Sequence, residues 1–524
     1  MGKVLLIVVL VLLVLAIAQM MRVYELSTKV RGRSDAAVTK RDNNMNAVLM
    51  LVFCIAFFIF VIWQMWEYGM GGKGPAVSIH GQVTDWLIGL NFGIIIPVFF
   101  LCNAVLFYFA FKYAYDKDRK AYYYAHNNKL ELVWTVVPAI VLAVIIVLGL
   151  RTWNEITDLS DNYVVQEHVI LPANGDDNNV KSTFEVKQVF ETAEEAGMHL
   201  SGLGGDAKNV LVEKNGSWVI QTYDQEGENE LVINEQKKYN SRNEALLAMV
   251  GEGVTSFTEL KEQKHIELYS KQWDWTTRYS GKDNELGDAD FKLIDYNSWG
   301  DANPFMNPLG LVSSETVELH LKRIDKRVDE INVFLDSEEA NYATDLELSD
   351  MTEEMERLKR KKQKIQATIA NEMELNELEK SDVNSRVYDD VVVKGDMHLV
   401  VGQPYEFQFK AQDVIHSAYF PHFRAQMNCV PGMATQMKLT PTMTTKDFKK
   451  DPEIIAKYEL INKKREKEGR PAVEPGFILL CNKICGTAHS NMWIKVIVET
   501  QEEYDAWIAE QKTFEQQLQE SELK

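Results

Sequence analysis

Long apolar runs are concentrated before residue 154 of the chain. Four stand out, at Val4–Met20, Ala47–Met65, Leu87–Phe111 and Leu132–Leu150. A helix needs about 20 residues to cross about 30 Å of hydrocarbon, so the last three runs are long enough to span a membrane. The first run is shorter and follows Lys3, so a cleaved signal peptide is the alternative to a helix there.

The charges of the connecting loops favour retention of the first helix. Basic residues gather in the loops at 21–46 and 112–131, whereas 67–86 carries only Lys73. The positive-inside rule places the two basic loops in the cytoplasm, so the fourth helix delivers everything after residue 154 to the outer side. Three spans alone would leave the large domain inside. We therefore predict four transmembrane helices.

After Asp158 the apolar runs become short and alternate with polar residues. They are rich in Val, Ile and aromatic residues and are bounded by Gly, Pro and Asp, which is typical of strands. The pattern predicts an antiparallel sandwich or barrel. The predicted strands are His265–Tyr269, Gln272–Tyr279, Asp390–Val393, Met397–Val401, Tyr405–Ala411, Gly476–Leu480 and Met492–Glu499.

Three stretches do not fit this sheet. Residues 160–262 are acidic and contain a predicted strand, Trp218–Thr222, and a predicted helix, Ser241–Val250, which indicates an inserted small domain. Residues 315–376 repeat apolar positions at helical spacing and predict an antiparallel helical hairpin. That hairpin is either a solvated decoration or a docking arm. Residues 443–473 are charged and predict a short helix.

Charge and cysteine content narrow the classes of function. The net charge of -20 argues against a nucleic-acid partner. There are 5 cysteines, an odd count with one close pair, Cys481 and Cys485, which is a poor disulfide framework. A metal site is the better interpretation of that pair.

The segment from Cys481 to Met492 carries the strongest chemical signal. It reads C-x3-C-x3-H-x2-M, with His489 as the imidazole, and it falls between two predicted strands. Thiolates, an imidazole and a thioether are soft ligands, which select copper over hard cations. The thioether argues against zinc. A further ligand must come from elsewhere, and His416 is the best candidate, with His422 as its competitor.

Several alternatives remain open on spacing alone. The cysteines could be a buried pair or a redox disulfide, or they could hold zinc together with His489 and His416. A mononuclear blue-copper site needs one Cys, two His and a Met. The second Cys instead suits two coppers bridged by both sulfurs.

Two further features have both a structural and a functional interpretation. In a strand, Trp273 and Trp275 would share a face. They would then pack in the core, or an exposed Trp near a redox metal would form an electron entry point. Glu131 stands at the start of the fourth apolar run, where an acid favours the positive end of the helix dipole.

Taken together, these segments resemble the second subunit of cytochrome c oxidases. The resemblance is carried by the metal loop, Asp413-Val414-Ile415-His416, the Gln-Trp-x-Trp motif, the stretch Phe420–Gly432, and Trp134-Thr135-x-x-Pro138. It covers the third and fourth helices and the sheet segments around 263–312, 386–442 and 475–510.

The resemblance implies a cupredoxin-like Greek-key barrel that holds two copper ions as a dinuclear, mixed-valence CuA centre. If the roles of the matching family residues apply here, Cys481 and Cys485 bridge both coppers. His416 and Met492 would complete one copper, and His489 and the carbonyl of Lys483 the other. Trp273 matches an electron-entry tryptophan. Glu131 matches the acid at the mouth of a proton channel that leads into the catalytic subunit.

The implied function is that of an electron-transfer subunit in a bacterial cytoplasmic membrane, with its copper domain on the periplasmic side. It would accept electrons from a c-type cytochrome and pass them to haem–copper catalytic subunit I, which reduces oxygen to water and translocates protons. The rivals are a CuA subunit of a nitric oxide reductase and a non-redox membrane scaffold with a structural zinc site. The quinol-oxidase version lacks copper, and the intact ligand set speaks against it.

The chain departs from the family pattern at several positions. Lys483 replaces a glutamate whose carboxylate reaches a magnesium or manganese ion at the subunit boundary, which argues against that ion site here. Arg278 and Asn428 stand where acids often line the face that receives the donor.

The expected division of the chain into domains is 1–66 for an extra transmembrane pair, 67–158 for the family's transmembrane hairpin, 159–262 for the inserted α/β domain, 263–514 for the cupredoxin-like domain with the hairpin 315–376 inside it, and 515–524 for a C-terminal tail.

Overall fold

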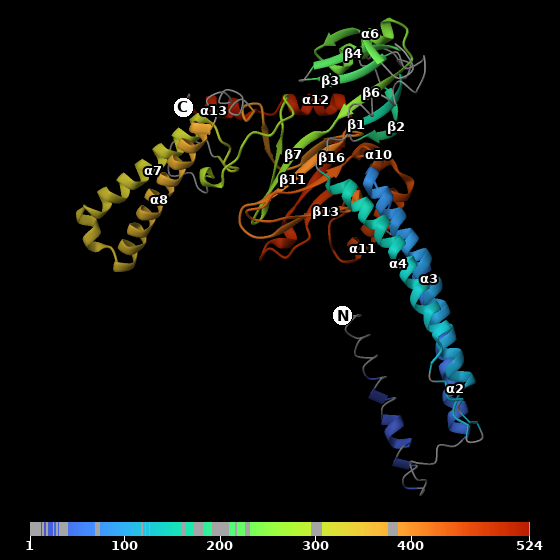
Figure 1. Ribbon diagram of the computed structural model, residues 1–524. Helices are drawn as coiled ribbons and strands as arrows, with labels where there is room; N and C mark the ends of the chain where they lie inside the picture. Colours follow the sequence, from blue (N-terminus) through green and yellow to red (C-terminus); the bar gives the residue numbers. More distant parts are fainter. Residues whose placement is uncertain are drawn as a thin grey trace. The chain divides into compact units, whose positions relative to one another are not determined.

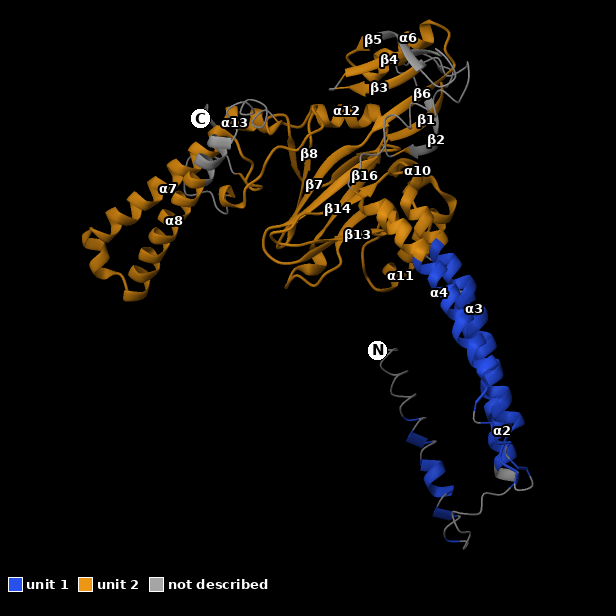
Figure 2. Ribbon diagram, viewed as in Figure 1, with its two compact units in different colours: residues 1–72, 87–146 blue, residues 73–86, 147–524 orange. Residues whose placement is uncertain are grey.

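The computed structural model divides the chain into two compact units (Figures 1 and 2). One unit contains residues 1–72 and 87–146, and the other contains 73–86 and 147–524. The structure describes residues 40–68, 74–116, 126–158, 163–170, 182–190, 209–214, 217–225, 231–294, 307–375 and 386–522, with short pieces before residue 31 and from 119 to 124. The predicted first span, Val4–Met20, lies mostly outside the described residues.

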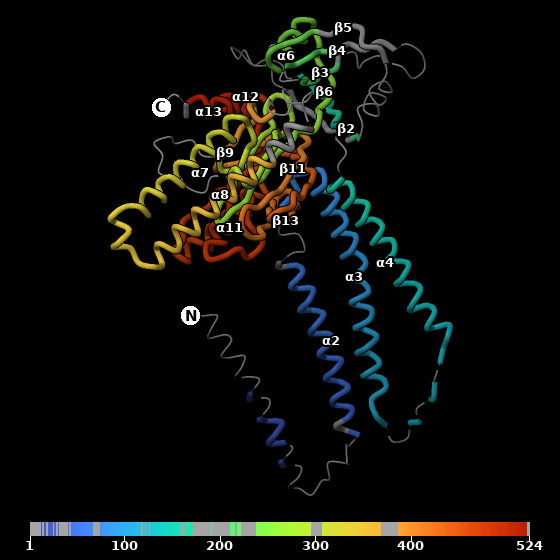
Figure 3. The backbone as a smooth tube through the Cα atoms, turned by 60° about the vertical axis from the view of Figure 1, so that its left-hand side comes forward, coloured from blue at the N-terminus to red at the C-terminus, as the bar shows by residue number. Residues whose placement is uncertain are grey.

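Three helices are long and apolar enough to cross a membrane. They are α2 (Lys40–Tyr68), α3 (Ile79–Lys112) and α4 (Asn128–Thr157). These helices confirm the second, third and fourth predicted spans. Figure 3 shows them as three long tubes. Their apolar side chains are largely exposed, as expected for surfaces that face lipid, and ring contacts such as Phe58 with Phe100 join α2 to α3.

Two five-stranded sheets form the centre of the second unit. Their strand orders are β10-β16-β15-β12-β13 and β14-β11-β7-β8-β9. The strands are β7 (Lys264–Lys271), β8 (Asp274–Tyr279), β9 (Val391–Lys394), β10 (Met397–Val400), β11 (Tyr405–Ala411), β12 (His416–Phe420), β13 (Ala425–Cys429), β14 (Thr435–Leu439), β15 (Phe477–Cys481) and β16 (Trp493–Glu499). Inward-facing residues from both sheets, among them Phe407, Phe420 and Val496, share one buried core.

All seven predicted strands of this region exist, but the expectation of purely antiparallel pairing is wrong. β10 pairs with β16 in parallel, and so does β7 with β11. Parallel neighbours need a long connection, and the chain supplies one between Lys271 and Tyr405. The strands β12, β13 and β14 were not predicted, because each is only five residues long and none contains Val or Ile. The Greek-key barrel stays a prediction.

The predicted strand Gln272–Tyr279 is too long at its start. β8 begins at Asp274, and Trp273 lies in the tight connection between β7 and β8. The expectation that Trp273 and Trp275 share a strand face is therefore wrong. Trp275 is buried in the core, whereas Trp273 is 38% exposed.

A separate six-stranded sheet precedes β7. Its order is β2-β1-β6-β3-β4-β5, from β1 (Tyr163–Ile170), β2 (Ser182–Phe190), β3 (Asn209–Lys214), β4 (Ser217–Gln225), β5 (Leu231–Tyr239) and β6 (Ser256–Glu262). Helix α6 (Arg242–Gly251) packs on it through Leu246 and Met249, and Ser241 caps its N-terminus. The predicted helix and the predicted strand Trp218–Thr222 are confirmed.

A buried ionic cluster lies between this sheet and helix α12 (Gln501–Ala509). Glu259 is fully buried and contacts Arg242 at 2.9 Å and Lys261 at 3.2 Å, and Arg242 also pairs with Glu502 at 2.5 Å. Burial alone would raise the pKa of Glu259, but Arg242 and Lys261 outweigh it and hold that pKa well below its usual range. The ionised cluster ties the six-stranded sheet to α12.

The segment after β8 forms the predicted helical hairpin, from α7 (Ser314–Leu335) and α8 (Asp345–Leu375). Ile324 and Ile331 of α7 are buried with Leu358 and Ile365 of α8. A hydrogen-bonded pair, Arg327 with Glu354, also joins the two helices.

Short helices complete the unit. The stretch 443–473 holds two helices, α10 (Thr445–Lys450) and α11 (Pro452–Lys467), because Asp451 ends the first and caps the second. Residues 515–522 of the predicted C-terminal tail belong to α13 (Phe514–Glu522), whose Phe514 and Leu518 are buried beside Tyr269, and residues 523–524 lie outside the described part of the chain.

Arg278 is completely buried in the second sheet. Its guanidinium donates to Asp390 Oδ2 at 2.5 Å and 3.0 Å and to Glu267 Oε2 at 3.2 Å. The expectation that Arg278 lies on a donor-receiving face is therefore wrong, whereas Asn428 is exposed. Arg278 instead pairs with two buried carboxylates, Asp390 and Glu267, and Glu267 also pairs with Lys410 at 3.0 Å.

Arg278→Met should destabilise the chain by about 3–5 kcal/mol, because it leaves the buried Asp390 carboxylate without its cation, whereas Glu267 keeps Lys410 at 3.0 Å. The matched control is Arg386→Met, whose partner Glu285 lies 2.6 Å away and whose pair is 43% and 55% exposed. That exposed pair should contribute only about 0–1 kcal/mol. Urea unfolding of the detergent-solubilised chain measures both, and equal losses would contradict the role of Arg278.

Candidate metal centre

The sulfur-rich loop connects β15 to β16 and is closed at its base. Cys481 is the last residue of β15, and its N–H donates to the carbonyl of Met492, just before β16, at 3.0 Å. A second bond, from Asn482 N–H to the carbonyl of Ser417 at 3.0 Å, ties the loop to β12. The predicted placement of this loop between two strands is confirmed.

The loop brings its soft donor atoms together. The sulfurs of Cys481 and Cys485 lie 3.8 Å apart. Cys485 Sγ lies 3.5 Å from His489 Nδ1 and 3.8 Å from Met492 Sδ. Cys481 Sγ lies 3.2 Å from the carbonyl oxygen of Lys483, whose own side chain is exposed. Both cysteines are free and buried.

His416 joins this group from the neighbouring strand. It is fully buried, and its Nδ1 lies 3.9 Å from Cys481 Sγ. Among the described residues, donor atoms of His416, Cys481 and Cys485 lie within 4.8 Å of one another. His416 is the first residue of β12.

His422, the competing histidine, lies elsewhere. It belongs to the short helix η3 (Pro421–Phe423), where its ring packs against Phe448 and Phe477. Burial, with help from Lys457 and Arg424, lowers the pKa of His422 to about 4. It is a neutral core histidine.

Asp413 orients His416 from outside the sulfur cluster. Its Oδ1 accepts from His416 Nε2 at 2.9 Å and from the backbone N–H of Val414 at 2.7 Å. Burial raises the pKa of Asp413, but its hydrogen bonds, led by the one from His416, lower that pKa below its usual value. An ionised Asp413 fixes the proton on Nε2 and leaves Nδ1 free to face the sulfurs.

Two tryptophans border the site in different ways. Trp275 is buried behind it, with its Nε1 donating to the carbonyl of Met492 at 3.4 Å. Trp273 lies on the outer side, against Gly486. Asp413 and Gln272, which hydrogen-bond around the site, both stand in segments that carry the family resemblance, but sequence analysis assigned neither a role. The spacing Asp-x-x-His could have indicated the role of Asp413, whereas the Gln-Trp-x-Trp motif does not show what Gln272 contacts.

The donor set fits a soft metal ion. Two thiols, two imidazoles, a thioether and one carbonyl converge, a combination that suits copper more than zinc or hard cations. Burial raises the pKa of Cys485 to about 11, which favours the thiol over the thiolate when no metal is bound. A metal would displace that proton, because metals bind the thiolate.

Glu131 lies in the first turn of α4, in the other unit. Its Oε1 accepts from the backbone N–H of Asn127 at 3.4 Å. The geometry shows the helix-start role that the sequence predicted for an acid at this position.

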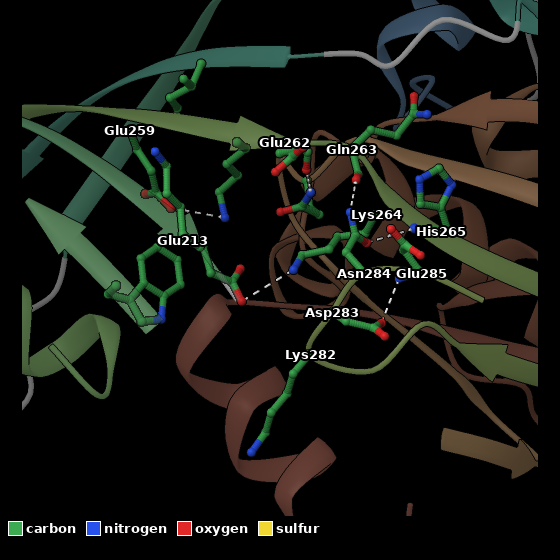
Figure 4. Close-up of a pocket in the computed structure, with 15 residues that line it drawn as sticks. Glu213, Glu259, Glu262, Gln263, Lys264, His265, Lys282, Asp283, Asn284 and Glu285 are labelled. Carbon is green, nitrogen blue, oxygen red and sulfur yellow. Dashed lines mark hydrogen bonds and ion pairs between the residues drawn. The ribbon is translucent and has the colours of Figure 1, made fainter. Parts of the chain in front are cut away.

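A polar cavity elsewhere contains none of the predicted site residues (Figure 4). It lies beside β3, β6 and β7, where Glu213 pairs with Lys264 at 3.3 Å. Two of its lining residues are hydrogen-bonded, because Asn284 Nδ2 donates to the carbonyl of Gln263 at 2.7 Å. Charges of both signs line it, so it selects no ligand class.

The helices, the paired sheets and the sulfur-rich loop define a membrane protein with a soft-metal site. Residues 75–152 match the family model of the cytochrome c oxidase subunit II transmembrane domain. The resemblance to cytochrome c oxidase subunit II is thereby confirmed.

Named relatives agree. The chain is 36% identical over 127 residues to an alternative cytochrome c oxidase subunit 2 of Bradyrhizobium diazoefficiens, covering 24% of this chain and 35% of the relative. It is 27% identical over 120 residues to cytochrome c oxidase subunit 2 of Thermostichus vulcanus, covering 23% and 27%. The chain thus matches about a third or less of the length of these relatives.

A comparison with solved structures also finds a match. It is the periplasmic domain of subunit II of the cytochrome oxidase of Bradyrhizobium japonicum, at 14% identity, covering 47% of this chain and 91% of that one. Its TM-score of 0.19 is too low to support a structural inference.

Asp413→Asn should weaken metal binding by about 10- to 100-fold, because the amide cannot hold the His416 tautomer as a carboxylate does. Chelator competition on the metal-free chain, with Cu(I) and with Zn(II), measures this. Asp283→Asn, a change of the same kind at an exposed position outside the site, is the control. Unchanged affinity in Asp413→Asn would show that the carboxylate does not orient His416.

Proposed function

We propose that this chain is the electron-transfer subunit of a cytochrome c oxidase and holds a dinuclear CuA centre. The observation that carries the proposal is the convergence of two cysteine sulfurs, 3.8 Å apart, with His416, His489, Met492 and the Lys483 carbonyl around them. A mononuclear site needs only one thiolate. Two buried thiols side by side suit two metal ions that share both sulfurs.

The resemblance to the family implies one arrangement of the ligands. Cys481 and Cys485 would bridge the two coppers, His416 and Met492 would complete one, and His489 and the Lys483 carbonyl would complete the other. When bound, the pair of coppers would accept one electron and share it between the two ions. The exposed Lys483 side chain offers no carboxylate, so we propose no magnesium or manganese ligand at this position.

The residues around the site suit rapid electron transfer. The loop is hydrogen-bonded to β12 and closed on itself, so its donor atoms need to move little when charge changes. Trp275 and the buried core exclude water from the inner side. The half-exposed Trp273 against Gly486 is the proposed entry point for electrons from a c-type cytochrome.

The membrane helices set the location. We propose that the metal domain lies on the periplasmic side of a bacterial cytoplasmic membrane, because basic residues gather in the loops 21–46 and 112–131. Electrons would pass to the haem–copper subunit I, which reduces oxygen and couples this to proton translocation. Glu131, at the cytoplasmic end of α4, is proposed to lie at the mouth of the proton channel.

Electron paramagnetic resonance of the copper-loaded chain tests the metal centre. We expect two coppers per chain and one unpaired electron shared equally between two copper nuclei. Cys481→Ser should abolish the shared signal, whereas Cys429→Ser, which alters a buried free cysteine outside the proposed ligand set, should keep it. One zinc per chain with no such signal would instead favour the structural scaffold.

Glu131→Gln separates helix capping from proton transfer. Glutamine keeps an oxygen that accepts from Asn127 N–H, so α4 and the thermal stability of the chain should be unchanged. Glutamine cannot carry a proton at this position, so turnover of the assembled oxidase should fall while reduction of the copper centre by the donor stays fast. Normal turnover would restrict Glu131 to capping.

A further inference from the structure

Gln272 joins three segments at the metal loop. It lies in the connection between β7 and β8, directly before Trp273. Its backbone N–H donates to Asp413 Oδ2 at 2.6 Å, and its side-chain Nε2 donates to the carbonyl of Cys485 at 2.7 Å. One residue therefore holds both the carboxylate that orients His416 and the bend that follows a ligand cysteine.

The connection between β7 and β8 packs against Gly486. Its φ of +126° is a conformation that side-chain-bearing residues rarely adopt. A Cβ at this position would lie 2.9 Å from Trp273 Cζ2 and 3.0 Å from Gln272 Nε2. The Trp273 ring and the Gln272 amide thus both pack directly on the bend after Cys485.

Packing alone leaves the Trp273 ring weakly fixed. The ring is 38% exposed and lies in a turn, whereas Trp275 is 1% exposed within β8. A half-exposed ring keeps rotamer freedom unless neighbouring groups remove it. The two hydrogen bonds of Gln272, to Asp413 and to the Cys485 carbonyl, anchor the turn at the residue directly before the ring.

We propose that Gln272 is a positioning residue that holds Trp273 against the metal loop. The side-chain bond to the Cys485 carbonyl fixes the distance between the ring and the ligand cysteine, and with it the rate at which electrons enter. This inference rests on the proposed entry role of Trp273. It assigns the position of the ring to a hydrogen bond that no local sequence pattern indicates.

Gln272→Leu removes the side-chain donor and keeps the backbone N–H that bonds Asp413. In stopped-flow mixing of the copper-loaded full chain with reduced mitochondrial-type cytochrome c, we expect reduction to slow by about tenfold. Copper content and the paramagnetic spectrum should be unchanged, because every proposed ligand is intact. Reduction by the small complex hexaammineruthenium(II), which needs no tryptophan, should keep its rate.

A double-mutant cycle shows whether Gln272 acts through Trp273. In a Trp273→Phe background, Gln272→Leu should slow reduction by less than about twofold, since the ring it positions is gone. The matched control is Gln412→Leu, the same change at the end of β11, where the residue contributes its backbone N–H to Ser270. This control should keep the wild-type rate.

A second measurement needs neither copper nor a donor. In the metal-free chain labelled with 5-fluorotryptophan, Trp273→Phe identifies the Trp273 resonance by its loss. Gln272→Leu should shift and narrow that resonance, because the ring gains freedom, whereas Gln412→Leu should leave it in place.

The outcomes separate the inference from the proposed function. If Trp273→Phe slows entry but Gln272→Leu changes neither the rate nor the resonance, the positioning role is wrong and the entry role stands. If neither substitution slows entry, the entry role fails and the inference fails with it. Loss of copper in Gln272→Leu would mean that Gln272 assembles the ligand loop, which also overturns the inference.

Discussion

The hydrogen bond from the Cys481 N–H to the Met492 carbonyl, 3.0 Å long, closes the loop on which the site depends. It makes the end of β15 and the start of β16 neighbours, so the residues between them must return to their point of departure. The short helix η4 (His489–Asn491) takes up part of that return and points His489 inward. Ligands that are spaced along the loop can come together in space because both ends of the loop are fixed to one sheet.

The same sheet also positions His416, the proposed ligand that is distant from the loop in sequence. Ala418 of β12 is the register partner of Cys481, and His416 lies two residues before it on the same face. Strand pairing therefore delivers His416 to the sulfurs, and Asp413 then sets the direction of its ring. The position of His416 is therefore set by the register of β12 with β15 and by its hydrogen bond to Asp413.

Sequence reasoning succeeded where chemistry is local and failed where it depends on pairing. The spacing from Cys481 to Met492 predicted the soft side chains of the loop, and helical periodicity predicted α7 and α8. Alternation could not show that the chain turns at Trp273, because a turn of two residues does not interrupt an apolar pattern. It also could not show that Arg278 is buried, since its partner Glu267 comes from β7 and its partner Asp390 from the residue directly before β9. Parallel pairing of β7 with β11 is equally invisible to local pattern.

The large additions to the chain avoid every segment that builds the site. The six-stranded sheet ends before β7, the hairpin of α7 and α8 lies between β8 and β9, and α10 and α11 lie between β14 and β15. The site uses only the β7–β8 connection, the β11–β12 connection with the start of β12, and the β15–β16 loop. Strand pairing fixes these three segments independently of the length of the other loops, because extending a surface connection costs little free energy. The chain can therefore carry extra domains without altering the geometry around Cys481 and Cys485.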